Sequence, residues 1–138
     1  MRFLSMIRIN ESTGQVPSEQ LMNDMGKLIE EMTREGTLIR TAGLRPTSQG
    51  RRVRLRKGQL STVDGPFTET KEVIGGFAIL EAPSMEAATE LTKRFLRIHG
   101  DAWEIECEVR QIDGPEFGSE SSGATDFQAS VPASTRRS

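Results

Sequence analysis

The residues of this sequence best suited to acid–base chemistry are its single histidine and an aspartate in a rigid turn. His99 is the only histidine, and histidine is the side chain whose ordinary pKa lies near neutrality. A carboxylate beside the ring would hold it in one tautomer, as a general acid–base catalyst requires. Asp64 is the candidate, because Gly65 permits a backbone conformation closed to other residues and Pro66 fixes the next φ. The alternatives are a histidine that interacts with the helix end before Gly100 and an aspartate that caps its own turn.

Aromatic and charged residues near this turn are candidates for ligand binding. Phe67 closes the turn, and Glu69 and Lys71 follow it in a short charged run. Arg45 belongs to a basic segment that extends from Arg40 to Lys57. Such charged runs are usually solvated, and the alternative is a pocket rim that attracts a small anion. In the catalytic interpretation, Lys71 or Arg45 holds an anionic group of the substrate.

Composition argues against several classes of function. One cysteine, Cys107, forbids an intrachain disulfide, and together with one histidine it removes the common zinc-binding patterns. The net charge of −2 provides no overall positive field for nucleic acid or anionic lipid. No apolar run reaches membrane-spanning length and no signal peptide is recognisable, so the expected compartment is the cytoplasm. The usual nucleotide-binding, metalloprotease, redox and hydrolase motifs are missing, and no cofactor is expected.

The elements that must position these residues follow one another as strands and helices. Residues 2–9 are apolar at nearly every position, which predicts a strand buried on both faces. Helices are predicted from Ser18 to Gly36 and from Pro83 to Gly100, by their apolar periodicity and their capping residues. Gly26 lies inside the first helix, where glycine costs about 1 kcal/mol relative to alanine, and this predicts close packing at that point.

The remaining strands are shorter. Residues 37–40 predict a strand, residues 53–57 and 59–63 a β-hairpin, and residues 76–81 a central strand. From Trp103 to Arg110 apolar and charged residues alternate, which predicts a last strand with one buried face. In that pattern Cys107 is a small buried apolar residue.

This order of elements predicts an α+β domain with a ferredoxin-like split βαβ topology and an added β-hairpin. Both helices then cover one face of an antiparallel sheet. The central strands are apolar on both sides, so the uncovered face is expected to meet a second copy in a homodimer. The apolar residues concerned are Leu4, Met6, Phe77 and Ile79. The domain is expected to span residues 1–117, and the Ser/Ala/Gly-rich segment 118–138 is predicted to be disordered.

The most informative stretch runs from Val63 to Phe77. It contains the turn Asp-Gly-Pro-Phe, then Glu-Thr-Lys-Glu at residues 69–72, then Gly-Gly-Phe at the start of a strand. This resembles the signature of YCII-related proteins of the DGPF type. Residues 43–46 and the pair His99-Gly100 fall where that family has a Leu-x-Pro and an Arg-His-Gly.

The resemblance covers about residues 1–113 and implies a ferredoxin-like dimer of the dimeric α/β-barrel type. It also implies a pocket faced by a histidine and an aspartate, which would be His99 and Asp64. Two differences lie beside this histidine. Ile98 stands where an arginine is usual, and Asp101-Ala102 intervenes before the final strand.

The residues and the resemblance together favour a homodimer with a small polar pocket that acts as an acid–base enzyme on a small carbonyl or lactone-like metabolite. In this hypothesis His99 moves the proton and Asp64 orients the ring. The alternative is a non-catalytic ligand-binding or regulatory accessory protein, since DGPF proteins resemble partners encoded beside alternative sigma factors. A structural dimer without a ligand is the third interpretation. Contact between His99 and a carboxylate in an enclosed pocket distinguishes the first from the others.

Overall fold

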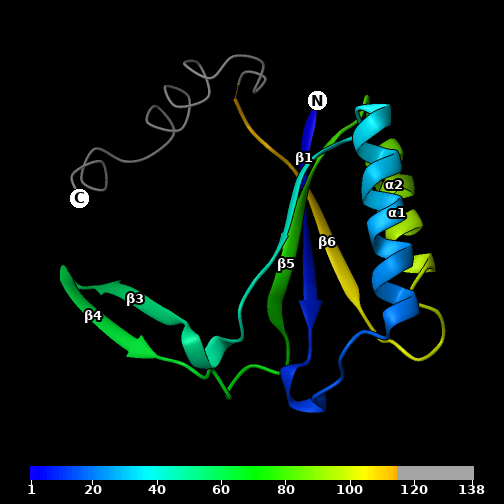
Figure 1. Cartoon of the computed structure of the whole chain (residues 1–138). Helices are drawn as coiled ribbons and strands as arrows, with labels where there is room; N and C mark the ends of the chain where they lie inside the picture. The colour runs from blue at the N-terminus through cyan, green and yellow to red at the C-terminus, as the bar shows by residue number, and fades with distance from the viewer. Residues whose placement is uncertain (115–138) are drawn as a thin grey trace.

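The computed structural model describes residues 1–114, and Figure 1 shows their arrangement. The predicted domain end at residue 117 and the segment 118–138 lie outside the described residues. In chain order the strands and helices are β1 (Arg2–Ile9), α1 (Glu19–Glu35), β2 (Leu38–Gly43), β3 (Arg51–Arg56), β4 (Gln59–Asp64), β5 (Val73–Glu81), α2 (Met85–Arg97) and β6 (Glu106–Gln111). Two short 3-10 turns, η1 (Glu11–Thr13) and η2 (Thr47–Gln49), lie in the loops.

Four of the strands form one antiparallel sheet in the order β2-β5-β1-β6. Both helices cover the same face of this sheet (Figure 1). The predicted α+β architecture with two βαβ units is therefore confirmed, and the topology is consistent with a ferredoxin-like fold. Within residues 1–114 the sheet stays open and forms no closed barrel.

Strands β3 and β4 form a separate two-stranded sheet, as the hairpin pattern predicts. We refer to residues 51–64 as the arm. The arm projects away from the sheet on the side opposite the helices (Figure 1).

Local capping determines where the helices begin. The Ser18 side chain accepts a hydrogen bond from the Leu21 N–H at 3.0 Å, and the Ser84 side chain accepts one from the Ala87 N–H at 3.1 Å. Gly36, with a φ of 81°, ends α1 in the left-handed conformation that glycine adopts without strain. These caps confirm the helix boundaries expected at three of the four ends.

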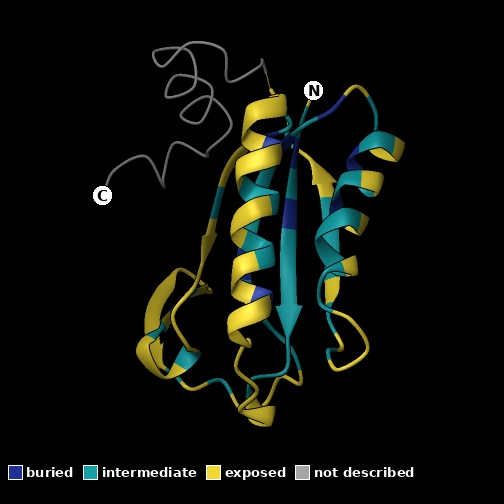
Figure 2. Cartoon of the chain, turned by 45° about the vertical axis from the view of Figure 1, so that its right-hand side comes forward, coloured by how far each residue is buried: buried dark blue, intermediate teal, exposed yellow. Residues whose placement is uncertain are grey.

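The core lies between the helices and the sheet. Phe3 on β1 is fully buried, and exposed residues follow the outer faces of both helices (Figure 2). The buried apolar cluster consists of Phe3, Met32, Leu38, Leu80, Ala82 and Ala88. Because side chains alternate along a strand, the residues next to Phe3 on β1 and next to Leu80 on β5 point to the uncovered face.

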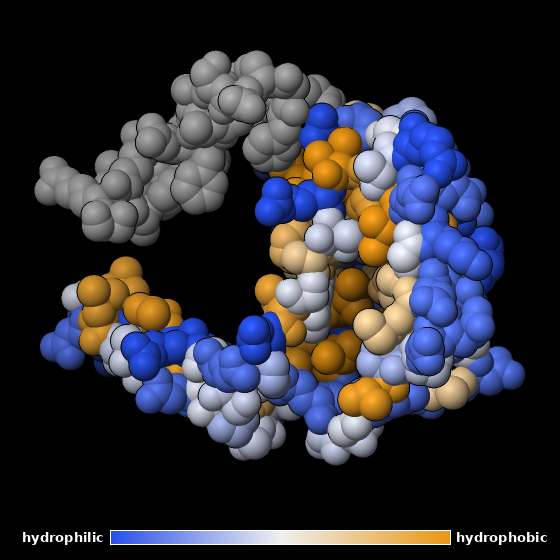
Figure 3. Space-filling view, viewed as in Figure 1, coloured by the Kyte–Doolittle hydropathy of each residue, from blue (hydrophilic) through white to orange (hydrophobic). Residues whose placement is uncertain are grey.

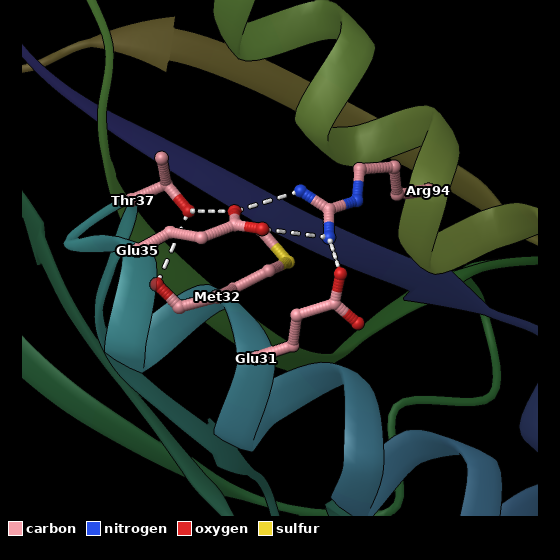
Figure 4. Close-up of polar contacts among 5 residues, drawn as sticks. All are labelled: Glu31, Met32, Glu35, Thr37 and Arg94. Carbon is pink, nitrogen blue, oxygen red and sulfur yellow. Dashed lines mark hydrogen bonds and ion pairs between the residues drawn. The ribbon is translucent and has the colours of Figure 1, made fainter.

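A polar bridge ties the two helices together. Arg94 on α2 donates hydrogen bonds to Glu35 at 2.9 Å and to Glu31 at 3.0 Å, both on α1 (Figure 4). The hydrogen bond from Arg94 lowers the pKa of Glu35 and, reciprocally, raises the pKa of Arg94. The bridge therefore helps to hold the helices side by side over one face of the sheet.

Three strand boundaries differ from the prediction by three residues, and the others by two or fewer. Strand β6 begins at Glu106, because its pairing with β1 starts at Arg8 and β1 ends one residue later. Residues 103–105 consequently have no strand to pair with, and their alternating pattern does not form a ladder. Strand β2 reaches Gly43 and β5 starts at Val73, because each continues for as long as its neighbour offers a partner.

The close packing expected at Gly26 is wrong, since a β-carbon there would meet no atom within 4 Å. We therefore expect Gly26→Ala to stabilise the domain by about 1 kcal/mol, because alanine is the better helix former. Urea unfolding should show a higher midpoint with an unchanged slope. Gly36→Ala is the matched control and should destabilise, since its φ of 81° strains any residue with a β-carbon. A midpoint for Gly26→Ala at or below that of the original chain would contradict the prediction.

No helix in the part of the chain that the structure describes is long and apolar enough to cross a membrane.

Candidate functional site

The face of the sheet opposite the helices is apolar and has no cover within the described chain. We call it the open face. Met6 pairs with Phe77 and Leu4 with Ile79 across β1 and β5, so these four side chains form one patch. In Figure 3 the molecule is hollowed between the sheet and the arm, with hydrophobic side chains on both sides of the hollow.

The arginine cleft, as we call it, lies where the open face meets the base of the arm. Its volume is about 480 Å³. Strands β1 and β6 form one wall, and the loops at η2 and after β4 form the other. The lining residues are Met6, Arg8, Thr47, Arg52, Phe67, Glu72, Val73, Ile74, Glu108 and Arg110.

Two of the three arginines in the cleft share the same glutamate. Arg8 lies 3.4 Å from a Glu108 oxygen and 3.8 Å from a Glu72 oxygen, and Arg110 lies 4.0 Å from the other Glu108 oxygen. These are long, partly exposed pairs, which typically contribute about 0–1 kcal/mol each. The two guanidinium groups are therefore held near one another without being committed to strong partners.

The third arginine supports the aromatic wall. The guanidinium carbon of Arg52 lies 3.9 Å from the centre of the Phe67 ring, in cation–π contact. Arg52 also pairs with Glu69 at the rim. Hydrogen bonds from its own backbone N–H and from Arg52 lower the pKa of Glu69, so this carboxylate is ionised at neutral pH.

A hydrogen-bonded clamp joins the base of the arm to the end of β1. The Glu11 carboxylate accepts the Thr47 N–H at 2.8 Å and the Thr47 hydroxyl at 2.5 Å. The Thr47 hydroxyl oxygen in turn accepts the Phe67 N–H at 3.4 Å. This Glu11–Thr47 clamp positions the aromatic wall of the cleft.

The Asp-Gly-Pro-Phe turn packs directly against the same threonine. The Gly65 N–H donates to the Gly50 carbonyl at 3.0 Å. A β-carbon at residue 65 would lie 1.6 Å from the Thr47 carbonyl oxygen. Gly65 does not have a positive φ, so the expected reason for glycine is corrected: close approach of two backbone segments requires it.

The other predicted ligand-binding residues lie around this cleft. Lys71 shares a neighbouring cleft of about 390 Å³ with Phe67, and it also lines one of about 630 Å³ that reaches Trp103. Arg45 lines a separate cleft of about 350 Å³ near the end of β2. Of the four predicted ligand-binding residues, Phe67 therefore lies in the wall of the arginine cleft and Glu69 at its rim, whereas Lys71 and Arg45 line other clefts.

His99 and Asp64 do not meet. His99 lies with its Nδ1 atom 2.9 Å from the Phe95 carbonyl oxygen, and its ring packs edgewise against Phe95 and Trp103. Asp64 pairs instead with Arg51 at 2.7 Å and is largely exposed. The reason is topological: His99 follows α2 on the covered side of the sheet, whereas Asp64 ends the arm on the opposite side (Figure 1). Within residues 1–114 no carboxylate forms an ion pair with His99, so the predicted pairing is corrected for the single chain.

Cys107 has the structural position that the strand pattern predicts. It pairs with Ile7 on β1 and is partly buried. Burial raises the pKa of its thiol, which keeps the sulfur protonated and unreactive at neutral pH.

Sequence reasoning missed several residues of the cleft. Leu4, Met6 and Arg8 are every second residue of one strand and so lie on the same face. A charged residue at position 8 therefore indicates that the apolar face becomes polar at this end. The opposite charges of Glu108 and Arg110 share one face of β6 for the same reason. No local signal identifies the Glu11–Thr47 clamp, because its two residues are 36 positions apart.

Comparison with known proteins gives matches over most of the described chain. A family model described as the YCII-related domain matches residues 1–106, which include the clamp, the arm and α2. An uncharacterized protein of Rhizobium meliloti (strain 1021) is 31% identical over 75 residues. The match covers 54% of this chain and spans about 60% of the length of that relative. The chain belongs to the YCII-related family.

Proposed function

We propose that this protein is a homodimeric ligand-binding protein that takes a small organic anion in the arginine cleft. The observation that carries the proposal is the convergence of Arg8, Arg52 and Arg110, from three different strands, beside the Phe67 ring. Guanidinium groups recognise carboxylate and phosphate through paired hydrogen bonds. An aromatic ring with apolar neighbours accommodates the uncharged part of the same ligand.

The ion pairs of Arg8 and Arg110 do not prevent anion binding at these two residues. Glu108 and Glu72 hold the guanidinium groups of Arg8 and Arg110 in place only through long contacts. An incoming carboxylate or phosphate can take up their free N–H groups at small cost, since exposed pairs of this kind are weak. The glutamates then orient the arginines towards the ligand.

A second copy on the open face completes the site in this proposal. The patch of Leu4, Met6, Phe77 and Ile79 is the surface that such a copy would cover, as the dimeric α/β-barrel arrangement requires. Met6 belongs both to this patch and to the cleft, so dimerisation would also enclose the ligand. Electrostatic attraction strengthens when water is excluded. The cytoplasm is the compartment we assign to it.

Acid–base catalysis is a second candidate, supported by the state of the His99 ring. A carbonyl oxygen only accepts hydrogen bonds, so the contact with Phe95 requires a proton on Nδ1. The neutral ring then has its lone pair on Nε2, as a general base needs. The orienting group in this version is the Phe95 carbonyl instead of Asp64. The substrate, a small carbonyl or lactone-like metabolite, then binds in the cleft that Lys71 and Trp103 line, next to the His99 ring, and not in the arginine cleft. Turnover of a bound ligand that is lost in His99→Gln, with affinity kept, would support catalysis over binding alone.

We expect Arg8→Ala and Arg110→Ala each to weaken anion binding about tenfold to a hundredfold, because a hydrogen bond to a charged group contributes about 1.5–3 kcal/mol. Binding is measured by calorimetry, with ligands chosen from a panel of small carboxylates and phosphate monoesters. Sedimentation at micromolar concentration tests the dimer separately.

Arg34→Ala is the matched control for these variants. Arg34 is an exposed residue of α1 and pairs there with Glu30 at 3.1 Å. Helix α1 covers the face of the sheet opposite the open face (Figure 1). Loss of the Arg34 side chain should leave affinity unchanged. If it weakened binding as much as Arg8→Ala, or if neutral analogues bound equally well, the arginine cleft would not be the anion site.

A further inference from the structure

The arm has an apolar surface that its own chain leaves exposed. Leu55 pairs with Leu60 across the two strands, and Val53 lies two residues before Leu55 on the same face. The exposed fractions of Val53, Leu55 and Leu60 are 67%, 65% and 75%. In Figure 3 hydrophobic side chains gather at the outer end of the arm.

Such an arm needs cover to be stable. A two-stranded hairpin by itself is marginal in water, and the arm shares no strand pairing with the four-stranded sheet. Its base, however, is held by the Glu11–Thr47 clamp and by the Gly65 contact. The arm is therefore presented in a defined direction, with its apolar face unoccupied.

The charges on the arm match those on the free edge of the sheet. Arg54, Arg56 and Lys57 form no ion pair within residues 1–114. Strand β6 is an edge strand. Within the described residues, Glu106 at its start and Glu104 just before it also form no ion pair. The arm of a chain projects away from its own β6 (Figure 1), so these opposite charges cannot meet inside one copy.

We propose that the arm of each copy docks on the β6 edge of a second copy. Added as a strand at that edge, the arm places Arg54 and Arg56 beside Glu104 and Glu106 of the partner subunit on its open face. The three apolar side chains lie on the opposite face of the arm and so come beside Cys107 and Val109 of the partner subunit. The inference rests on the homodimer proposed above and adds the place where each arm binds. Glu108 of the same strand lines the arginine cleft, so the partner's arm would bring further positive charge to the edge of the anion site.

Spin labelling tests where the arm lies. The variant Gln59→Cys with Cys107→Ser carries one nitroxide at the outer end of the arm. Chains that carry the nitroxide are mixed with ¹⁵N-enriched chains that carry no nitroxide. Any broadening of the amide NMR signals then comes from a nitroxide on a second copy. We expect broadening of the amide signals of residues 104–108. Asn23→Cys with Cys107→Ser places the label on the outer face of α1 and should leave these signals sharp.

A charge exchange provides an independent measurement. Arg54→Glu with Arg56→Glu should raise the dimer dissociation constant about threefold to tenfold, since each exposed ion pair contributes only weakly. Adding Glu104→Arg and Glu106→Arg in the same chain should restore it. Arg34→Glu should have no effect.

The outcomes separate the two proposals. If the protein sediments as a dimer but the amide signals of residues 104–108 stay sharp and the charge exchange gives no rescue, the arm docking is overturned and the dimer remains. A monomer at micromolar concentration overturns both. Broadening at residues 104–108 together with rescue supports the docking.

Discussion

Gly65→Ala is expected to disrupt the base of the arm and to destabilise the domain by about 3 kcal/mol or more. The new β-carbon would lie 1.6 Å from the carbonyl oxygen of Thr47 and 2.7 Å from its carbonyl carbon. Both atoms belong to the backbone, so no side-chain rotation relieves the overlap. Either η2 or the Asp-Gly-Pro-Phe turn has to move, and the hydrogen bond between Gly65 and Gly50 is lost with it.

Urea unfolding measures this loss, and anion affinity measures its effect on the cleft. Phe67 is the last residue of the turn, so displacement of the turn should also abolish binding. Gly43→Ala is the matched control, because a β-carbon there would meet nothing within 4 Å. If both alanine variants unfolded at the same urea concentration, the turn would not pack on η2 as described.

Glu11→Ala should cost about 2–3 kcal/mol, because Thr47 loses both of its hydrogen bonds to a charged acceptor. The Thr47 N–H and hydroxyl are partly buried and would be left without these partners. Glu11→Gln retains one good acceptor and should lie between the original chain and the alanine variant. Chemical unfolding measures the order of the three proteins.

The clamp makes a second, local prediction for the same variants. Loss of Glu11 should speed hydrogen exchange at the amides of Thr47, Gly65 and Phe67 more than in the core strands. Glu30→Ala removes an exposed pair within α1 and should leave this exchange unchanged. Equal stability of Glu11→Ala and Glu30→Ala would show that the clamp does not hold the arm.

These two predictions concern the part of the molecule that makes the site. Glu11, Thr47 and Gly65 bring three loops together at one end of the sheet. Phe67 and Arg52 reach the open face only because that junction directs the arm. A weakening there should therefore reduce ligand affinity even where no ligand-contacting residue has changed.

The sequence by itself determined the elements and their order. Ser18, Ser84 and Gly36 act through hydrogen bonds and backbone preferences within a few residues, so their effect can be read locally. The apolar periodicity of α1 and the double-sided apolar pattern of β1 likewise depend only on neighbouring positions. From these signals the split βαβ order and the Asp-Gly-Pro-Phe turn follow without coordinates.

Only the tertiary structure decided which of the candidate residues meet. Asp64 and His99 both lie near element ends, but the arm and α2 leave the sheet on opposite sides, so the pair is not formed within the chain. Arg8 and Glu108 are 100 positions apart and become neighbours through the pairing of β1 with β6. Such contacts depend on strand register and on the direction of a hairpin, which arise from the packing of the whole domain and leave no mark on adjacent residues.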